Sequence, residues 1–127
     1  MEAMAQRRSP KAYALQPWVS ANIDNREPAG YAQIGTSLFE CEAFHQLSPQ
    51  QRYTYLCMVC NAKGKREFEF PRRCFKQFGI PHGTARAAIE ALIAAKFIER
   101  EYSGKIMRDA NKYRFALGWK LGGEEAK

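Results

Sequence analysis

The sequence predicts an α+β fold that is mostly helical. Residues 48–62 and 84–96 place apolar side chains three and four positions apart, which gathers them on one face of a helix. Residues 66–70 and 111–117 instead alternate polar and apolar side chains, as half-buried strands do. A chain of 127 residues that is 46% hydrophobic is long enough for one domain with a core of its own.

We expect three parts along the chain. Residues 1–30 carry prolines and a glycine without a sustained period of 2 or 3.6, which indicates an irregular N-terminal extension. Residues 31–121 hold the domain, and residues 122–127 form a short tail. The extension is either a plain tail or has one of two roles: the basic stretch 6–11 could touch phosphates, and Trp18 could dock on the domain or on a partner.

The first half of the domain is expected to hold two helices. The first covers about 37–47, with Thr36 or Ser37 as its cap. The second covers 48–62 and begins with Ser-Pro-Gln-Gln, an N-cap Ser followed by Pro at the first helical position and Gln at the third, which is a capping box. The face that this second helix is expected to bury carries Tyr53, Leu56, Cys57 and Cys60.

The four cysteines do not predict a metal site. Cys57 and Cys60 form a C-x-x-C pair, but a zinc site usually needs a second pair at similar spacing. Cys41, Cys74 and both histidines stand alone in the sequence. We expect Cys57 and Cys60 to be small core hydrophobes, with metal binding and redox chemistry as less favoured alternatives, and we expect no cofactor.

The second half is expected to begin with a short strand at 66–70. A short helix over 71–78 and a longer one over 84–96 follow, joined by a tight turn at Gly79, a residue that tolerates positive φ. The stripe that the longer helix is expected to bury is Ala85, Ala88, Ile89, Leu92 and Ile93.

A β-hairpin is expected to close the domain. Its strands cover 97–102 and 111–117, and the second strand places Tyr113, Phe115 and Leu117 on one face. The basic residues expected toward its tip are Arg100, Lys105, Arg108, Lys112 and Arg114.

All of the excess positive charge lies in residues 61–127. That half holds fifteen Lys and Arg against eight Asp and Glu, which accounts for the net charge of +7, whereas residues 1–60 are neutral. Such a balance favours a polyanion, either nucleic acid or an acidic membrane surface, and the alternative is an ordinary solvated face. No stretch approaches 18 consecutive apolar residues and the start does not resemble a signal peptide, so we expect a cytoplasmic protein without a membrane span.

The order of the expected elements has a physical logic. An α-helix fits the major groove of B-DNA, a second helix packed behind it fixes its angle, and a basic hairpin beside it reaches the flanking backbone. Residues 67–117 have this order and contain the run Phe75-x-x-Phe78-Gly79-Ile80-x-x-Gly83-Thr84-Ala85-Arg86-x-Ala88-Ile89-x-x-Leu92-x-x-x-x-Phe97-Ile98. The run resembles bacterial winged helix-turn-helix regulators, which implies a three-helix core with a C-terminal β-hairpin wing.

Two flanking stretches are similar to the winged-helix proteins of bacterial plasmids and conjugative elements. They are Leu47-Ser48-Pro49-x-x-Arg52-x-x-Tyr55-Leu56 and Asn111-Lys112-Tyr113-Arg114-Phe115. Those proteins include replication initiators, relaxosome accessory proteins and regulators. The resemblance covers about residues 34–120 and implies binding of double-stranded DNA in transcription regulation, DNA replication or DNA processing on a mobile element.

The resemblance implies that residues 82–96 form the helix that reads DNA and that residues 97–117 form a basic wing. Arg86 would meet guanine O6 and N7 or a phosphate, with Glu90 further along the same side. Pairing of Arg86 with Glu90 is the alternative, as is simple solvation of the wing charges. The implied DNA-contacting residues are His82, Gly83, Thr84, Arg86 and Ala87 on this helix, Arg72, Arg73 and Lys76 on the helix before it, and Lys105, Arg108 and Lys112 in the wing.

Three positions depart from the family pattern. Pro81 stands where a capping Ser is usual, Gly83 weakens the helix start, and Lys96 replaces the Gly that usually precedes the wing. The reading helix is also rich in Ala and poor in Asn, Gln and Arg. Specificity is then expected to come from DNA shape, the wing, a dimer or partner proteins, or to be low.

The main alternative function is a winged-helix module for protein–protein interaction without DNA binding. An enzyme is not expected, since the sequence shows no nucleophile–base pair, no metal-ligand set, no Gly-rich phosphate loop and no paired carboxylates in an apolar context. We expect a homodimer, formed through the N-terminal extension or the first helix, because two-fold symmetry doubles the DNA surface that is buried. Other proteins of a DNA-processing complex are further expected partners.

Overall fold

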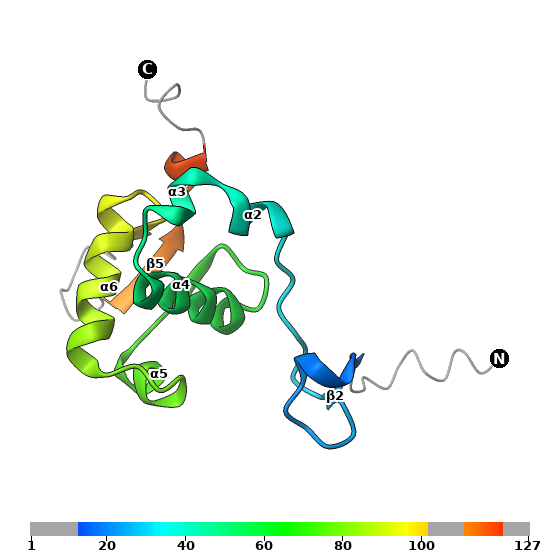
Figure 1. The fold of residues 1–127 in the computed structure, drawn as a ribbon. Helices are drawn as coiled ribbons and strands as arrows, with labels where there is room; N and C mark the ends of the chain where they lie inside the picture. The colour runs from blue at the N-terminus through cyan, green and yellow to red at the C-terminus, as the bar shows by residue number, and fades with distance from the viewer. Residues whose placement is uncertain (1–12, 102–110, 121–127) are drawn as a thin grey trace. The chain divides into compact units, whose positions relative to one another are not determined.

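The computed structural model describes residues 13–101 and 111–120, which form an α+β fold (Figure 1). The chain divides into two units, residues 1–33 and residues 34–127. Among the described residues, no helix is long and apolar enough to cross a membrane.

The first unit contains a small antiparallel pair of strands within the segment that was expected to be irregular. Strand β1 (Tyr13–Ala14) pairs with β2 (Arg26–Glu27), and the 3-10 helix η1 (Pro17–Val19) lies between them in sequence. The Tyr13 and Tyr31 rings meet edge to face with centroids 5.3 Å apart. The unit is too small to bury its own apolar residues, and Ile23 is 98% exposed.

The second unit opens with two short helices, α2 (Thr36–Glu40) and α3 (Glu42–His45), and not with the single helix predicted over 37–47. Cys41 is extended between them, with φ −89° and ψ 148°. The break has a packing reason. Leu38 and Phe44 both pack on the core, yet six positions along one continuous helix would point them about 120° apart.

Helix α4 (Pro49–Ala62) begins as predicted. The Gln51 amide donates to Ser48 Oγ (3.2 Å) and the Ser48 amide donates to Gln51 Oε1 (2.9 Å), so the capping box is complete. Its predicted buried face is only partly right, because Tyr53 and Cys60 are exposed. The side chains that α4 buries are Thr54, Tyr55, Cys57, Met58 and Ala62.

Thr54 explains why the buried face of α4 was misjudged. Its hydroxyl donates to the Gln50 carbonyl, 2.8 Å away within the same helix, so a polar side chain that is 0% exposed keeps a hydrogen bond. Tyr53 instead lies at the surface, where its hydroxyl donates to the Phe78 carbonyl at 2.8 Å. The spacing of apolar residues in the sequence predicts neither of these hydrogen bonds.

The two strands of the expected hairpin pair antiparallel, and a third strand extends them into a three-stranded sheet. Strand β5 (Lys112–Phe115) lies between β3 (Glu67–Glu69) and β4 (Ile98–Arg100). The predicted strands are confirmed with shorter bounds, and Phe68 pairs with Tyr113 across the sheet. The structure adds the pairing of β3 with β5, which joins a strand in the middle of the domain to a strand near its end.

Two helices joined by a tight turn, α5 (Arg72–Gln77) and α6 (His82–Ala94), lie between β3 and β4. Gly79 has φ 70°, as the turn requires, and Ile80 is buried. Helix α6 begins at His82, two residues before the predicted Thr84, because the Ala85 amide already bonds the Pro81 carbonyl at 2.9 Å. The predicted stripe is confirmed: Ala85, Ala88, Ile89 and Leu92 are buried and Ile93 is half-buried.

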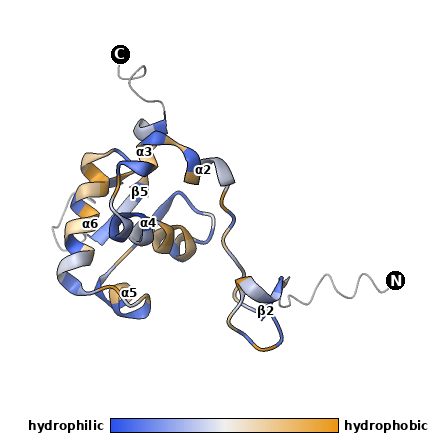
Figure 2. Cartoon of the chain, viewed as in Figure 1, coloured by the Kyte–Doolittle hydropathy of each residue, from blue (hydrophilic) through white to orange (hydrophobic). Residues whose placement is uncertain are grey.

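The core of this unit lies where α4 and α6 pack together and against the sheet. Phe97, at the start of β4, is fully buried, and the Trp119 ring stacks on it at 4.8 Å. Leu117, predicted on the buried face of the last strand, is 49% exposed because β5 ends at Phe115. Helix α6 carries both apolar and polar residues around its circumference (Figure 2), so its outer side is free to face something other than this core.

Candidate functional site

Two adjoining hollows lie beside α5 and α6, and we refer to them together as the basic groove. The first, of about 650 Å³, lies between the start of α5 and the start of α6. The second, of about 570 Å³, continues along α6 to the sheet. Both hollows share three lining residues, Arg72, Phe75 and His82, so they form one continuous depression.

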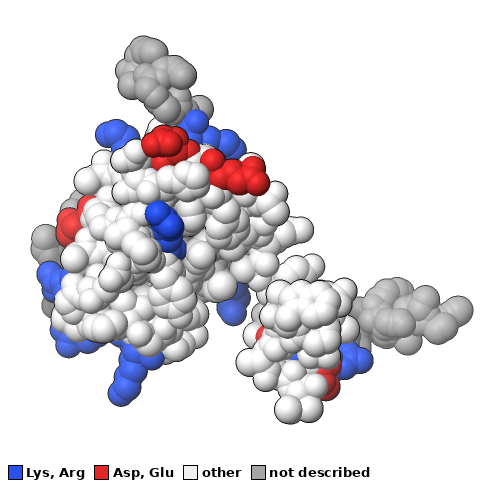
Figure 3. Space-filling view, in the orientation of Figure 1, with Lys and Arg blue, Asp and Glu red and all other residues white. Residues whose placement is uncertain are grey.

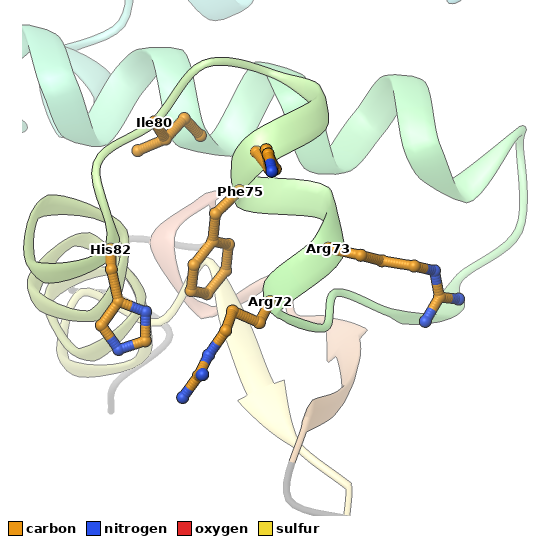
Figure 4. A pocket seen from close by; sticks show the side chains of 6 residues that line it. Arg72, Arg73, Phe75, Ile80 and His82 are labelled. Carbon is orange, nitrogen blue, oxygen red and sulfur yellow. The ribbon is translucent and has the colours of Figure 1, made fainter.

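The floor of the basic groove is aromatic and its rim is polar. Phe75 is 7% exposed, and its ring centroid lies 5.6 Å from that of His82. Arg72 and His82 extend to the same side, on either side of Phe75, as Figure 4 shows. Arg73 extends away from them, although it borders the first hollow. The groove thus combines an aromatic base with basic side chains from α5 and an imidazole from α6.

The sheet end of the groove is held by an ion pair. Arg100 on β4 donates from Nη2 to Glu90 Oε2 on α6 at 2.6 Å. The Arg100 guanidinium also lies over the Tyr113 ring, 5.9 Å from its centroid. The hydrogen bond from Arg100, together with the positive charges of Arg100 and Arg86, lowers the pKa of the Glu90 carboxyl. Glu90 is therefore a carboxylate at neutral pH.

The outer side of α6 is formed by short side chains around one arginine. Gly83 and Ala87 are exposed and Thr84 is half-buried, while Arg86 is exposed at the edge of the second hollow. In the described part of the chain, Arg86 makes no hydrogen bond and no ion pair. No side chain caps the start of this helix, because its N-cap is Pro81.

The structure brings together some of the predicted contact residues and not others. Lys112, predicted in the wing, is half-buried on β5 outside the groove, and Lys105 and Arg108 lie outside the described residues. The predicted residues that line the groove are Arg72, Arg73, Lys76, His82 and Arg86.

Three groove residues from the sheet side were missed as site residues: Arg100, Asn111 and Tyr113. A signal existed for Arg100, because it follows the apolar Ile98 by two positions and so shares its face of β4. Arg100 and Arg114 lie on β4 and β5, within the two strands that were predicted over 97–102 and 111–117. Arg114 pairs there with Glu99 at 2.8 Å.

One alternative is corrected by the geometry. Pairing of Arg86 with Glu90 along the helix was considered, but the carboxylate of Glu90 is bonded by Arg100. Glu90 pairs with Arg100 in preference to Arg86 because Arg100 is already positioned over Tyr113. Arg86 would lose side-chain entropy to form an exposed ion pair, which contributes little free energy.

The cysteines do not gather into a ligand set. Within residues 13–101 and 111–120, no group of three His, Cys, Asp or Glu side chains could hold a metal ion. Burial raises the pKa of the Cys57 and Cys74 thiols, which disfavours the reactive thiolate. Cys60 is exposed, so the expectation that it belongs to the core is wrong.

No protein-family model, no curated protein and no solved structure matches this chain. The assignment of a function therefore depends on the basic groove and on the surfaces beside it.

Proposed function

We propose that residues 34–120 form a winged helix-turn-helix domain that binds double-stranded DNA, with α6 as its reading helix. The order of elements supports this proposal: α4, β3, the pair α5 and α6 around a tight turn, then β4 and β5. In this arrangement α5 packs behind α6, and the strand pair β4–β5 is the base of the wing.

The observation that carries the proposal is the gathering of basic side chains at the basic groove. Arg72, Arg73 and Lys76 come from α5 and Arg86 from α6, while Arg100 from β4 is paired there with Glu90. Figure 3 shows Lys and Arg over α5 and beside α6, together with further Lys and Arg near the Asp and Glu that lie over α2 and α3. A duplex backbone carries one negative charge per 1.7 Å or so of axis, so the cationic surface over α5 and α6 attracts it.

The outer side of α6 suits close approach to a DNA groove. Gly83 and Ala87 are exposed and short, so the helix backbone is not held away from the groove walls. The first turn of α6 lacks a side-chain cap, so no capping side chain accepts from its amides. Helix starts of this kind favour a phosphate oxygen, which adds to the charge of the groove.

The process that such binding serves is proposed on the resemblance alone. The stretches around Ser48 and Tyr113 are similar to winged-helix proteins of plasmids and conjugative elements. We therefore propose a role in regulation, replication initiation or DNA processing on a bacterial mobile element.

The test is fluorescence anisotropy with a labelled 30-base-pair duplex of random sequence, titrated from about 50 to 300 mM salt. We expect micromolar or tighter binding at low salt and a steep fall with rising salt. Arg72→Ala and Arg86→Ala should each weaken binding and reduce the slope of log K against log salt by about one.

Lys65→Ala is the matched control for these variants. Lys65 is exposed between α4 and β3 and does not line the groove, so its loss removes one charge without touching the proposed interface. Equal weakening by Lys65→Ala and Arg86→Ala would mean that net charge alone drives binding. Absence of binding at 50 mM salt would exclude the proposed function.

A protein-interaction role is the second candidate, favoured by the apolar surface of the first unit. Trp18 is 79% exposed, Val19 60% and Ile23 98%, a density of apolar exposure that a free surface rarely carries. The partner proposed for it is a second copy of this chain. Light scattering should then give a dimer for the wild type and a monomer for Trp18→Ala/Ile23→Ser.

A further inference from the structure

We propose that Glu90 is a specificity-determining residue of the DNA interface: its carboxylate accepts a hydrogen bond from the N4 amino group of a cytosine in the major groove and disfavours duplexes that offer no such donor there. The inference rests on the proposed function, because Glu90 lies on the same side of α6 as Arg86.

Glu90 is the one acidic residue among the described side chains that line the basic groove. Its side chain is 62% exposed, and it follows Arg86 by one helical turn. Four residues of helix rise about 6 Å, which is close to two base-pair steps of about 3.4 Å each. When Arg86 meets one base pair, Glu90 therefore faces a pair about two steps away.

The carboxylate is oriented by a residue of the sheet. Arg100 donates to its Oε2 oxygen, and Arg100 is itself positioned over the buried Tyr113 ring. Within the described residues, no donor reaches Oε1. Glu90 thus presents one unused acceptor toward solvent from a defined position, which is what direct base readout needs.

The stability of the fold does not explain the Arg100–Glu90 ion pair well. Exposed ion pairs typically contribute about 0–1 kcal/mol, whereas a carboxylate among the cations of a DNA interface repels every phosphate that approaches. That repulsion increases specificity where it lowers the affinity for other sequences more than the affinity for one preferred sequence.

Cytosine is the base that a carboxylate accepts from in the major groove. Guanine and thymine present acceptors at the equivalent position, and adenine places its N7 acceptor beside its amino group.

The experiment uses the full chain and a pool of duplexes with a randomised central segment. Bound duplexes are recovered and sequenced, and affinities for the unselected pool are measured by anisotropy. Wild type should enrich a cytosine about two positions from a guanine. Glu90→Gln should shift the preference from cytosine toward adenine, because an amide both accepts from N6 and donates to N7, keep the guanine preference, and bind the unselected pool roughly two- to fivefold more tightly.

Glu99→Gln is the control, because it removes the same charge from an exposed ion pair with Arg114 on β5, outside the groove. It should leave the enriched sequence unchanged. Enrichment of the same cytosine by Glu90→Gln, or equal tightening by both variants, would overturn the role of Glu90 while leaving DNA binding in place. Failure of the wild type to bind any duplex would instead overturn the proposed function itself.

Discussion

Helices α4 and α6 pack against each other in one core, but their polar side chains differ in the contacts that they make. The start of α4 is closed by Ser48 and Gln51, and its Arg52 is bound within the fold. The start of α6 has Pro81 as its N-cap without a side-chain cap, and its Arg86 has no partner among the described residues. The comparison indicates that α4 uses its polar side chains to hold the domain together, whereas the start of α6 and Arg86 make no such contacts within the described residues.

The largest expected effect concerns the buried side of α4. Burial raises the pKa of Tyr55 from 10.0 to about 12. The folded state therefore keeps the Tyr55 proton at a pH where the unfolded chain has released it. The free energy of unfolding is unaffected by this group below pH 10 and falls as the pH rises from 10 toward 12. Two pKa units correspond to about 2.7 kcal/mol in the free energy of unfolding.

Chemical denaturation at several pH values checks this prediction. Wild type should lose stability steeply above pH 10, and Tyr55→Phe should lose less over the same range. Some loss will remain in the variant, because burial also raises the pKa of Tyr113. Parallel curves for the two proteins would show that the Tyr55 hydroxyl is not protected by the core.

The two arginines give the next prediction. Arg52 donates to the carbonyls of Phe44, His45 and Leu47 at 3.0–3.2 Å and so completes the end of α3. Arg52→Ala should lower the free energy of unfolding by roughly 2 kcal/mol, because three carbonyls lose a charged donor. Its effect on the affinity for a duplex should be small.

Arg86→Ala should behave in the opposite way. The affinity for a random duplex should fall roughly five- to tenfold, while the free energy of unfolding should change by less than about 0.5 kcal/mol. Measuring both quantities on both variants separates a structural arginine from a binding one. If Arg86→Ala proved the more destabilising, the contrast between α4 and α6 would fail.

The helix starts give a smaller pair of effects. Ser48→Ala should lower the free energy of unfolding by about 1 kcal/mol, since the capping box is lost. Pro81→Ser should raise it by about 0.5 kcal/mol, because the new hydroxyl can accept from an amide in the first turn of α6. The same hydroxyl would compete with a phosphate, so Pro81→Ser should not tighten duplex binding; tighter binding would argue against a role of these amides.

Local signals in the sequence predicted local structure well. The capping box at Ser48 and the turn at Gly79 depend on a few neighbouring residues, and both are where the pattern puts them. The break at Cys41 and the burial of Thr54 were missed, because they are decided by how helices meet the core.

The candidate site was likewise predicted only in part. Arg86 was predicted from the resemblance of one helical segment to a known family, whereas Arg100 reaches the groove because β4 lies beside α6.

The smallest expected effects concern the helix ends. A lysine in the left-handed region follows each of α4 and α6, where glycine is less strained. Lys63, the C-cap of α4, has φ 50°, and Lys96, the second residue after the end of α6, has φ 67°. Lys63→Gly should raise the free energy of unfolding by about 0.5 kcal/mol, since Lys63 is exposed and strain relief exceeds the added entropy of the unfolded chain. Lys96 differs, because its side chain packs so closely on Gly118 that a Cβ there would lie 2.8 Å from the Lys96 Cβ. Lys96→Gly loses that packing and should gain less than Lys63→Gly in the same thermal or urea denaturation; an equal gain would show that the contact with Gly118 contributes nothing to the end of α6.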